Sequence, residues 1–225
     1  MPTRTFAAVL FDLDGVLIDT ESSITALWAE IFAGYDLHFT RQEITRLTAG
    51  QRFSGVLQQL EEQRGWKAPE DFLPMLDERF NRAFEEVPVI EGAAETLAAL
   101  KRTGLPFAVA SNSQHNRLFM KLEGAGLLPA FQGRAYDPSL TNKIGKPAPD
   151  LYLYAARQLN VSIHDCLVIE DSAPGATAGV AAGATTWGFL AGSHIHTGDE
   201  KRLRDIGVSH IVHSHAQLRE ALGLS

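Results

Sequence analysis

Short apolar runs recur along the chain and are separated by stretches with helical spacing. A continuous apolar run of this kind is typical of a central strand that is covered on both faces of a parallel sheet. The stretches between the runs place apolar residues three and four positions apart, as amphipathic helices do. The predicted strands are residues 7–11, 106–111, 166–171, 184–189 and 210–214. Strands that alternate with helices predict an α/β fold with a Rossmann-like, mainly parallel sheet.

Three of the predicted helices carry clear end signals. The helix over residues 92–104 ends on Lys101 and Arg102 followed by Gly104, which is a common C-terminal arrangement. A second helix has Pro149 where the first helical residue belongs. The third, residues 173–183, consists mostly of small residues and stops at Gly183, so it can approach a sheet closely.

Between residues 19 and 87 the pattern changes, because no apolar strand run occurs there. Four amphipathic helices are predicted instead, over residues 22–35, 41–50, 54–65 and 72–86. We therefore expect an all-α helical-bundle cap, residues 19–87, inserted after the first strand of a discontinuous α/β core. The core is expected to comprise residues 1–18 and 88–225.

Composition narrows the classes of function. The chain has 225 residues and a formal net charge of -7, which gives no electrostatic footprint for nucleic acid or for an anionic membrane surface. An anionic substrate must then be held by local positive charge. Cys166 is the only cysteine, which excludes an internal disulfide and fits a reducing compartment. The N-terminal apolar run is too short for a signal peptide or a membrane span, so we expect a cytoplasmic protein.

Polar residues gather where the predicted strands end. In an open parallel sheet the ligand site lies beyond the carboxyl ends of the strands. Carboxylates that converge there stay ionised only with a cation, and a set of oxygen ligands suits Mg²⁺. Mg²⁺ beside a lysine and small hydroxyl and amide groups meets the demands of phosphoryl transfer. The residues in question are Asp12, Asp14, Ser111, Asn112, Glu170 and Asp171, with Lys146 shortly before a predicted helix.

The segments DLDGV, SN, KP and ED, in this order and with a helical insert after the first, resemble the haloacid dehalogenase superfamily of aspartate-nucleophile phosphatases. The resemblance is to its β-phosphoglucomutase-like branch and covers essentially the whole chain. It implies that Asp12 is the nucleophile and that Asp14 is the general acid and base. It further implies that Ser111, Lys146 and the backbone N–H of Asn112 hold the phosphoryl group, and that Asp12, the backbone carbonyl of Asp14, Glu170 and Asp171 bind the metal.

Other residues have two interpretations. Asp19 leads into the first cap helix, and we favour an N-cap or a hinge role over ligand binding. Lys143 is a rival of Lys146 for phosphate, but Lys146 precedes a proline, as the superfamily pattern requires. Arg52 lies in a glycine-containing break between cap helices, where it either binds an anionic part of the substrate or is a solvated surface arginine.

Histidines gather late in the chain, and Cys166 begins a predicted strand. The histidine spacing resembles no zinc site, so we interpret these histidines as surface or packing residues and Cys166 as a small buried hydrophobe. The histidines concerned are His194, His196, His210, His213 and His215.

The function that these features favour is a Mg²⁺-dependent phosphatase that hydrolyses a small phosphorylated metabolite, such as a sugar phosphate, through an aspartyl-phosphate. A β-phosphoglucomutase-type transfer is the alternative, although the chain has Ile24 and Gln114 where the mutases carry a histidine and a lysine. A non-catalytic module that binds a phosphorylated ligand is less favoured, because no core group is missing. We expect no nucleic-acid or membrane partner, and the sequence does not indicate an oligomeric state.

Overall fold

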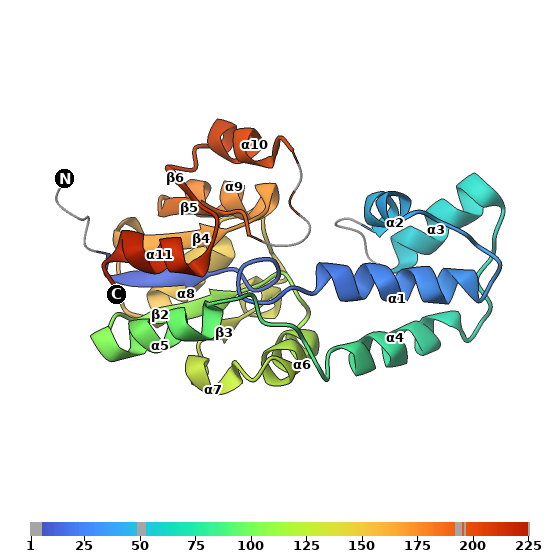
Figure 1. Cartoon of the computed structure of the whole chain (residues 1–225), viewed down its shortest axis with the longest axis horizontal. Helices are drawn as coiled ribbons and strands as arrows, with labels where there is room; N and C mark the ends of the chain where they lie inside the picture. Colours follow the sequence, from blue (N-terminus) through green and yellow to red (C-terminus); the bar gives the residue numbers. More distant parts are fainter. Residues whose placement is uncertain (1–5, 49–52, 192–194, 196, 225) are drawn as a thin grey trace. The chain divides into compact units, whose positions relative to one another are not determined.

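The computed structural model describes residues 6–48, 53–191, 195 and 197–224, and the chain forms two compact units (Figure 1). One unit contains the described parts of residues 1–20 and 85–225. The other is the stretch Glu21–Phe84, which lies between them in the sequence. No helix within the described residues has both the length and the apolar character required to cross a membrane.

The first unit is built on a parallel sheet. Six strands are found among its described residues, in the order β3-β2-β1-β4-β5-β6, and every neighbouring pair is parallel. The predicted α/β fold with a mainly parallel sheet is confirmed. The strands are β1 (Ala8–Phe11), β2 (Phe107–Ala110), β3 (Ala135–Tyr136), β4 (Cys166–Glu170), β5 (Thr185–Phe189) and β6 (His210–Val212). Only β3 was not among the predicted strands, because two residues are too few to show a period.

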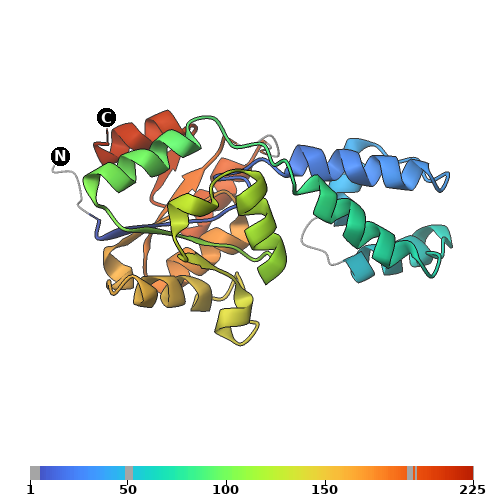
Figure 2. The ribbon, with the colours of Figure 1, turned by 90° about the horizontal axis from the view of Figure 1, so that it is seen from below.

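Helices cover both faces of this sheet. Figure 2 shows α5 and α11 on one face and α8 on the other. Pro149 is the N-cap residue of α8 rather than its first helical residue, a shift of one position from the prediction. The helices are α5 (Ala93–Thr103), α6 (His115–Gly124), α7 (Leu128–Phe131), α8 (Asp150–Gln158), α9 (Ala173–Ala182), α10 (Asp199–Ile206) and α11 (His215–Leu222), with 3-10 turns η1 (Pro138–Thr141) and η2 (Ile163–Asp165).

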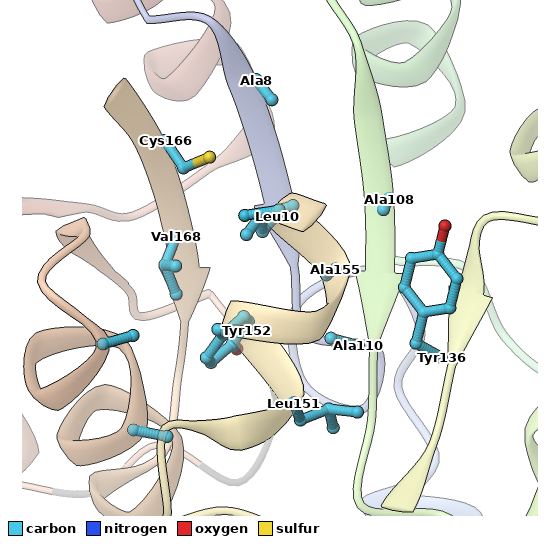
Figure 3. Close-up of a cluster of buried hydrophobic side chains, with 13 residues drawn as sticks. Ala8, Leu10, Ala108, Ala110, Tyr136, Leu151, Tyr152, Ala155, Cys166 and Val168 are labelled. Atoms are coloured by element: carbon cyan, nitrogen blue, oxygen red, sulfur yellow. The ribbon is translucent and has the colours of Figure 1, made fainter. Parts of the chain in front are cut away.

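A hydrophobic core lies between the sheet and α8. Leu10 of β1 and Val168 of β4 face Tyr152 and Ala155 of this helix, and all are fully buried (Figure 3). Alanines on β1, β2 and α8 keep the layer thin, so the helix approaches the strands closely. Close packing of this kind fixes the position of α8, and with it the position of the loop that precedes the helix.

The strand register brings the candidate residues together. Phe11 of β1 lies opposite Val109 of β2 on one side and Ile169 of β4 on the other. The three strands therefore end at about the same height, and the residues that follow them share one edge of the sheet.

The second unit consists of four helices among its described residues. Its interior is aromatic: Trp28 stacks on Phe32 with ring centroids 4.9 Å apart, and it meets Phe53 and Phe80 edge-on at 5.6 and 5.3 Å. Aromatic pairs in these arrangements add to the free energy that their burial provides. The helices are α1 (Glu21–Ala33), α2 (Arg41–Thr48), α3 (Phe53–Arg64) and α4 (Phe72–Ala83).

The two chain segments that lead to the second unit are hydrogen-bonded to each other within the first. The N–H of Asp19 donates to the carbonyl of Pro88 at 2.8 Å, and the N–H of Ile90 donates to the carbonyl of Leu17 at 3.0 Å. Ile18 forms an antiparallel bridge with Val89 between these two bonds. The outgoing and the returning segment thus form a short two-stranded connection.

Candidate active site

Three buried polar residues meet at the carboxyl edge of the central strands. Asp12 directly follows β1, Ser111 directly follows β2, and Glu170 is the last residue of β4. Their exposed fractions are 8%, 2% and 0%. Backbone hydrogen bonds hold the first two, because the N–H of Asp12 donates to the carbonyl of Ile169 and the N–H of Ser111 donates to that of Tyr136.

A group of carboxylates at this edge has the composition of a site for a divalent cation. Asp12, Glu170 and Asp171 each offer one oxygen, and these three oxygens lie within 4.8 Å of one another. Burial raises the pKa of Asp12 well above its usual value; Lys146 lowers it by less, and Glu170 and Asp171 raise it further. A hard cation would relieve the repulsion between these three carboxylates. Carboxylate oxygens are ligands that Mg²⁺ prefers. The residues present therefore fit the predicted Mg²⁺.

Lys146 lies among these carboxylates. Its ammonium is 2.5 Å from Asp12 Oδ1 and 2.6 Å from Glu170 Oε1, and it sits 4.7 Å from the centre of the Tyr152 ring. Burial lowers the pKa of Lys146, but the charges of Asp12 and Glu170 outweigh this and raise it to about 12. The lysine is consequently a fixed positive charge beside Asp12.

The side chain of Asn112 fixes the backbone at Lys146. Its amide nitrogen donates to the carbonyl of Lys146 at 2.9 Å, and its Oδ1 accepts from the N–H of Lys146 at 2.8 Å. Gly145 makes room for this pair of bonds, because a Cβ at that position would lie 2.5 Å from the same Oδ1. The loop after β2 and the loop before α8 are thereby joined.

Both carboxylate oxygens of Glu170 accept hydrogen bonds. Tyr152 donates its hydroxyl to Oε1 at 2.7 Å, and the hydroxyl of Ser172, the N-cap of α9, donates to Oε2 at 3.0 Å. Burial, and next the charge of Glu170, raise the pKa of Tyr152 well above its usual value, so the phenol remains a donor. A Cβ at Gly175 would coincide with this carboxylate, so the helix reaches Glu170 only with glycine there.

Asp14 has its own partners. Lys121 of α6 lies 2.8 and 3.0 Å from the two oxygens of Asp14, Thr20 donates to Oδ1 at 2.6 Å, and Ser113 lies 3.3 Å from Oδ2. Burial acts to raise the pKa of Asp14, but the charge of Lys121 and these hydrogen bonds lower it below its usual value. The side chain of Asp14 is therefore an ionised group that stands apart from the carboxylates around Lys146.

Comparison with known proteins assigns the family. Residues 6–183 match the haloacid dehalogenase-like hydrolase family. The chain belongs to this family. The four motifs predicted this family, and the prediction is confirmed.

Individual relatives of this hydrolase agree with the assignment. It is 48% identical to a family hydrolase from Deinococcus radiodurans R1 solved with bound phosphate and sodium, over 98% of each chain and with a TM-score of 0.88. It is 26% identical to 6-phosphogluconate phosphatase of Escherichia coli, over 83% of this chain and 84% of that one. It is 29% identical to a bifunctional riboflavin kinase/FMN phosphatase of Arabidopsis thaliana, over 79% of its own length but only 46% of that protein. The predicted enzyme class, a phosphoric monoester hydrolase of this superfamily, is confirmed.

The hydrolase brings together most of the candidate site residues. Lys146 is buried at the site, whereas its rival Lys143 is exposed on the preceding turn. Asp19 lies at the connection to the second unit, where its backbone pairs with Pro88. The three carboxylates that could hold a cation do not include that of Asp14. The backbone carbonyl of Asp14 therefore stays a predicted ligand. Arg52, His194 and His196 lie outside the described residues.

Sequence reasoning missed Lys121, Thr20, Ser113 and Tyr152. A signal for Lys121 was present, because it lies at helical spacing with the buried Leu118 and Leu122. A lysine on the apolar face of a helix requires a partner, although the sequence does not indicate which residue that is. The other three carry hydroxyl groups without a distinctive pattern.

Proposed function

We propose that this hydrolase is a Mg²⁺-dependent phosphatase of a small phosphorylated metabolite, such as a sugar phosphate, and that it acts through an aspartyl-phosphate on Asp12. One observation carries the proposal. A buried aspartate at the end of the central strand has a buried lysine and two further carboxylates around it. This arrangement combines a nucleophile, a cation for phosphate oxygens and a set of metal ligands.

In the first half of the reaction an Asp12 oxygen attacks the phosphorus, and the bond from phosphorus to the ester oxygen breaks. The departing oxygen takes a proton from the Asp14 carboxyl group, which is then ionised. Lys146 and Ser111 hold the phosphoryl oxygens during the transfer, and the N–H of Asn112 donates to one of them.

In the second half a water molecule attacks the phosphorus of the aspartyl-phosphate. The ionised Asp14 takes a proton from this water, and Asp12 leaves as a carboxylate. Asp14 thereby regains the proton that it gave away, and inorganic phosphate is the second product. The lowered pKa of Asp14 favours the ionised state that this half requires, whereas the first half requires an Asp14 that has taken up a proton before the transfer.

Asp12, Glu170 and Asp171, with the backbone carbonyl of Asp14, would hold Mg²⁺. When bound, Mg²⁺ neutralises charge on the phosphoryl oxygens and on the three carboxylates. The solved Deinococcus radiodurans relative has phosphate and sodium bound, which supports a site for phosphate and a cation in this family.

We infer that the helical unit selects the substrate, with Arg52 as a candidate substrate contact. The relatives' names point to phosphorylated small molecules, including 6-phosphogluconate and FMN. The cytoplasmic location and the absence of nucleic-acid and membrane partners stay predictions.

A phosphate-release assay tests the proposal. The purified chain with Mg²⁺ is expected to release phosphate from at least one member of a panel of sugar phosphates, 6-phosphogluconate, FMN and p-nitrophenyl phosphate. Asp12→Asn should lower kcat by several orders of magnitude, because the amide is a poor nucleophile of similar shape. The matched control is Asp36→Asn at a fully exposed aspartate, which should keep wild-type activity. Activity of Asp12→Asn within about tenfold of wild type would remove Asp12 from its role.

The same assay separates hydrolysis from phosphoryl transfer between sugars. A mutase would convert a sugar monophosphate to its isomer, with a bisphosphate as activator, and release little phosphate. Ile24 and Gln114 stand where the mutases carry their histidine and lysine, so we expect phosphate release to dominate.

A further inference from the structure

Lys121 occupies a position at which a helix of this kind normally carries an apolar residue. It lies on the inner face of α6 with Leu118 and Leu122, and only 7% of its surface is exposed. Burial of an ammonium group is unfavourable unless the group is paired and hydrogen-bonded. Packing of α6 therefore does not account for a lysine at this position.

Lys121 contacts both oxygens of one carboxylate. Its ammonium lies 2.8 Å from Oδ1 and 3.0 Å from Oδ2 of Asp14, and 3.1 Å from the hydroxyl of Ser113. The lysine thus bridges both oxygens of Asp14. Charge-assisted hydrogen bonds of this type are about twice as strong as neutral ones.

Two further contacts complete the arrangement. Thr20 binds Oδ1 and Ser113 binds Oδ2, so each oxygen of Asp14 has one hydroxyl group and shares the ammonium. The partners come from separate parts of the chain, namely the end of the first segment, the loop after β2 and α6. A carboxylate with donors on both oxygens has its plane and its direction fixed.

The two aspartates of the DLDGV segment therefore form ion pairs with different lysines. Lys146 pairs with Asp12 and Glu170, whereas Lys121 pairs with Asp14. The carboxylates whose oxygens lie within 4.8 Å of one another include Asp12 but not Asp14. Without Lys121, the Asp14 carboxylate would lose the only lysine contact that the described residues record for it and could turn toward the cation site.

We propose that Lys121 is a positioning residue, which holds the Asp14 carboxylate in the orientation needed for proton transfer and keeps it out of the cation site. The proposal rests on the proposed function, in which Asp14 gives a proton to the leaving group. Lys121 itself touches no reacting atom and acts through Asp14.

The leaving group provides the kinetic test. An alkyl phosphate has a strongly basic leaving oxygen that requires a proton, whereas the p-nitrophenolate of p-nitrophenyl phosphate departs without one. The ratio kcat/KM reports the steps up to the first irreversible one, which is formation of the aspartyl-phosphate. Lys121→Met removes the charge and keeps an unbranched side chain. We expect it to lower kcat/KM for the best alkyl phosphate by about 10- to 100-fold and to change kcat/KM for p-nitrophenyl phosphate by less than about threefold.

A double variant shows whether Lys121 acts through Asp14. Asp14→Asn should show the same substrate pattern with a larger loss. Addition of Lys121→Met to Asp14→Asn should then cause no further loss on the alkyl phosphate, because the group that the lysine positions is already absent. The matched control, Lys101→Met at an exposed lysine of α5, should leave both substrates unaffected. Equal losses on both substrates, or additive losses in the double variant, would overturn the proposal.

A crystal structure of Lys121→Met gives a test that needs no activity. In this variant the Asp14 carboxylate is expected to turn and lose its hydrogen bonds to Thr20 and Ser113. A carboxylate in the same position as in the wild-type protein would overturn the proposal. If Lys121→Met does not fold, Lys121→Gln carries the same measurements, with smaller losses expected because the amide keeps one donor. Wild-type protein that releases phosphate from neither substrate would instead overturn the proposed function, and the crystal structure would still decide the role of Lys121.

Discussion

The buried His215 should make the stability of this protein depend on pH. It is the first residue of α11 and is fully buried, and its Nε2–H donates to the carbonyl of Val16 at 2.8 Å. Its ring lies 4.7 Å from that of Phe189, and among the described residues its Nδ1 has no hydrogen-bond partner. Protonation would place a charge on this unpartnered nitrogen.

The magnitude follows from the shift of the His215 pKa. Burial lowers this pKa from its ordinary value of 6.5 to about 4; the bond to Val16 and the charge of Glu95 oppose the change, and the charge of Arg219 adds to it. Between these two pH values the unfolded chain binds a proton that the folded chain does not. The contribution is therefore fully present above pH 6.5 and is lost as the pH falls toward 4. It amounts to about 2 kcal/mol between pH 7.5 and pH 5, and to about 3 kcal/mol in full.

Urea unfolding followed by circular dichroism, at intervals from pH 7.5 to pH 4.5, measures this effect. His215→Gln keeps an N–H near the position of Nε2 but does not titrate. The difference in unfolding free energy between wild type and His215→Gln removes the contribution of the carboxylates, which titrate in both proteins. We expect this difference to shrink by about 2 kcal/mol from pH 7.5 to pH 5. A difference that stays constant between pH 7.5 and pH 5 for His215→Gln would refute the reasoning.

Three further outcomes are expected. Asn112→Ala removes both hydrogen bonds to the backbone of Lys146, so the free energy of unfolding measured in urea should fall by about 2 to 3 kcal/mol. An unchanged urea midpoint would contradict this role of the Asn112 side chain. Gly175→Ala places a methyl group on the Glu170 carboxylate and should abolish most phosphate release, whereas Gly104→Ala, at an exposed helix end, should keep the activity. Chelation should stop turnover and Mg²⁺ should restore it, while Ca²⁺ should inhibit because it prefers more ligands and looser geometry; full activity in excess chelator would refute the metal assignment.

Parts of the fold and the site that depend on local patterns could be predicted from the sequence. Asp12 and Glu170 stand at the ends of apolar runs, and the rule that ligands bind beyond the carboxyl ends of parallel strands places them together. Lys146 was selected over Lys143 because a proline follows it. These inferences needed only a few neighbouring residues each.

Contacts between distant segments could not be predicted in this way. Lys121 and Asp14 are 107 positions apart, and helical spacing shows that the lysine faces inward but not what it meets. The prediction for Asn112 concerned its backbone, whereas its side chain joins two loops that lie 34 positions apart. Such pairings depend on the exact placement of helices on the sheet, which no single-sequence period encodes.

The paired segments around Asp19 and Pro88 have a consequence for how this hydrolase could change during evolution. Because the outgoing and returning chain are already hydrogen-bonded at the sheet, the core is closed before the helical unit begins. The entropy of closing a loop grows only slowly with its length, so an insert of a different size at this point disturbs the sheet little. The helical unit is in this sense a replaceable module. Its exchange for a short turn, or for another helical bundle, should leave the sheet folded and the carboxylates at its edge in place.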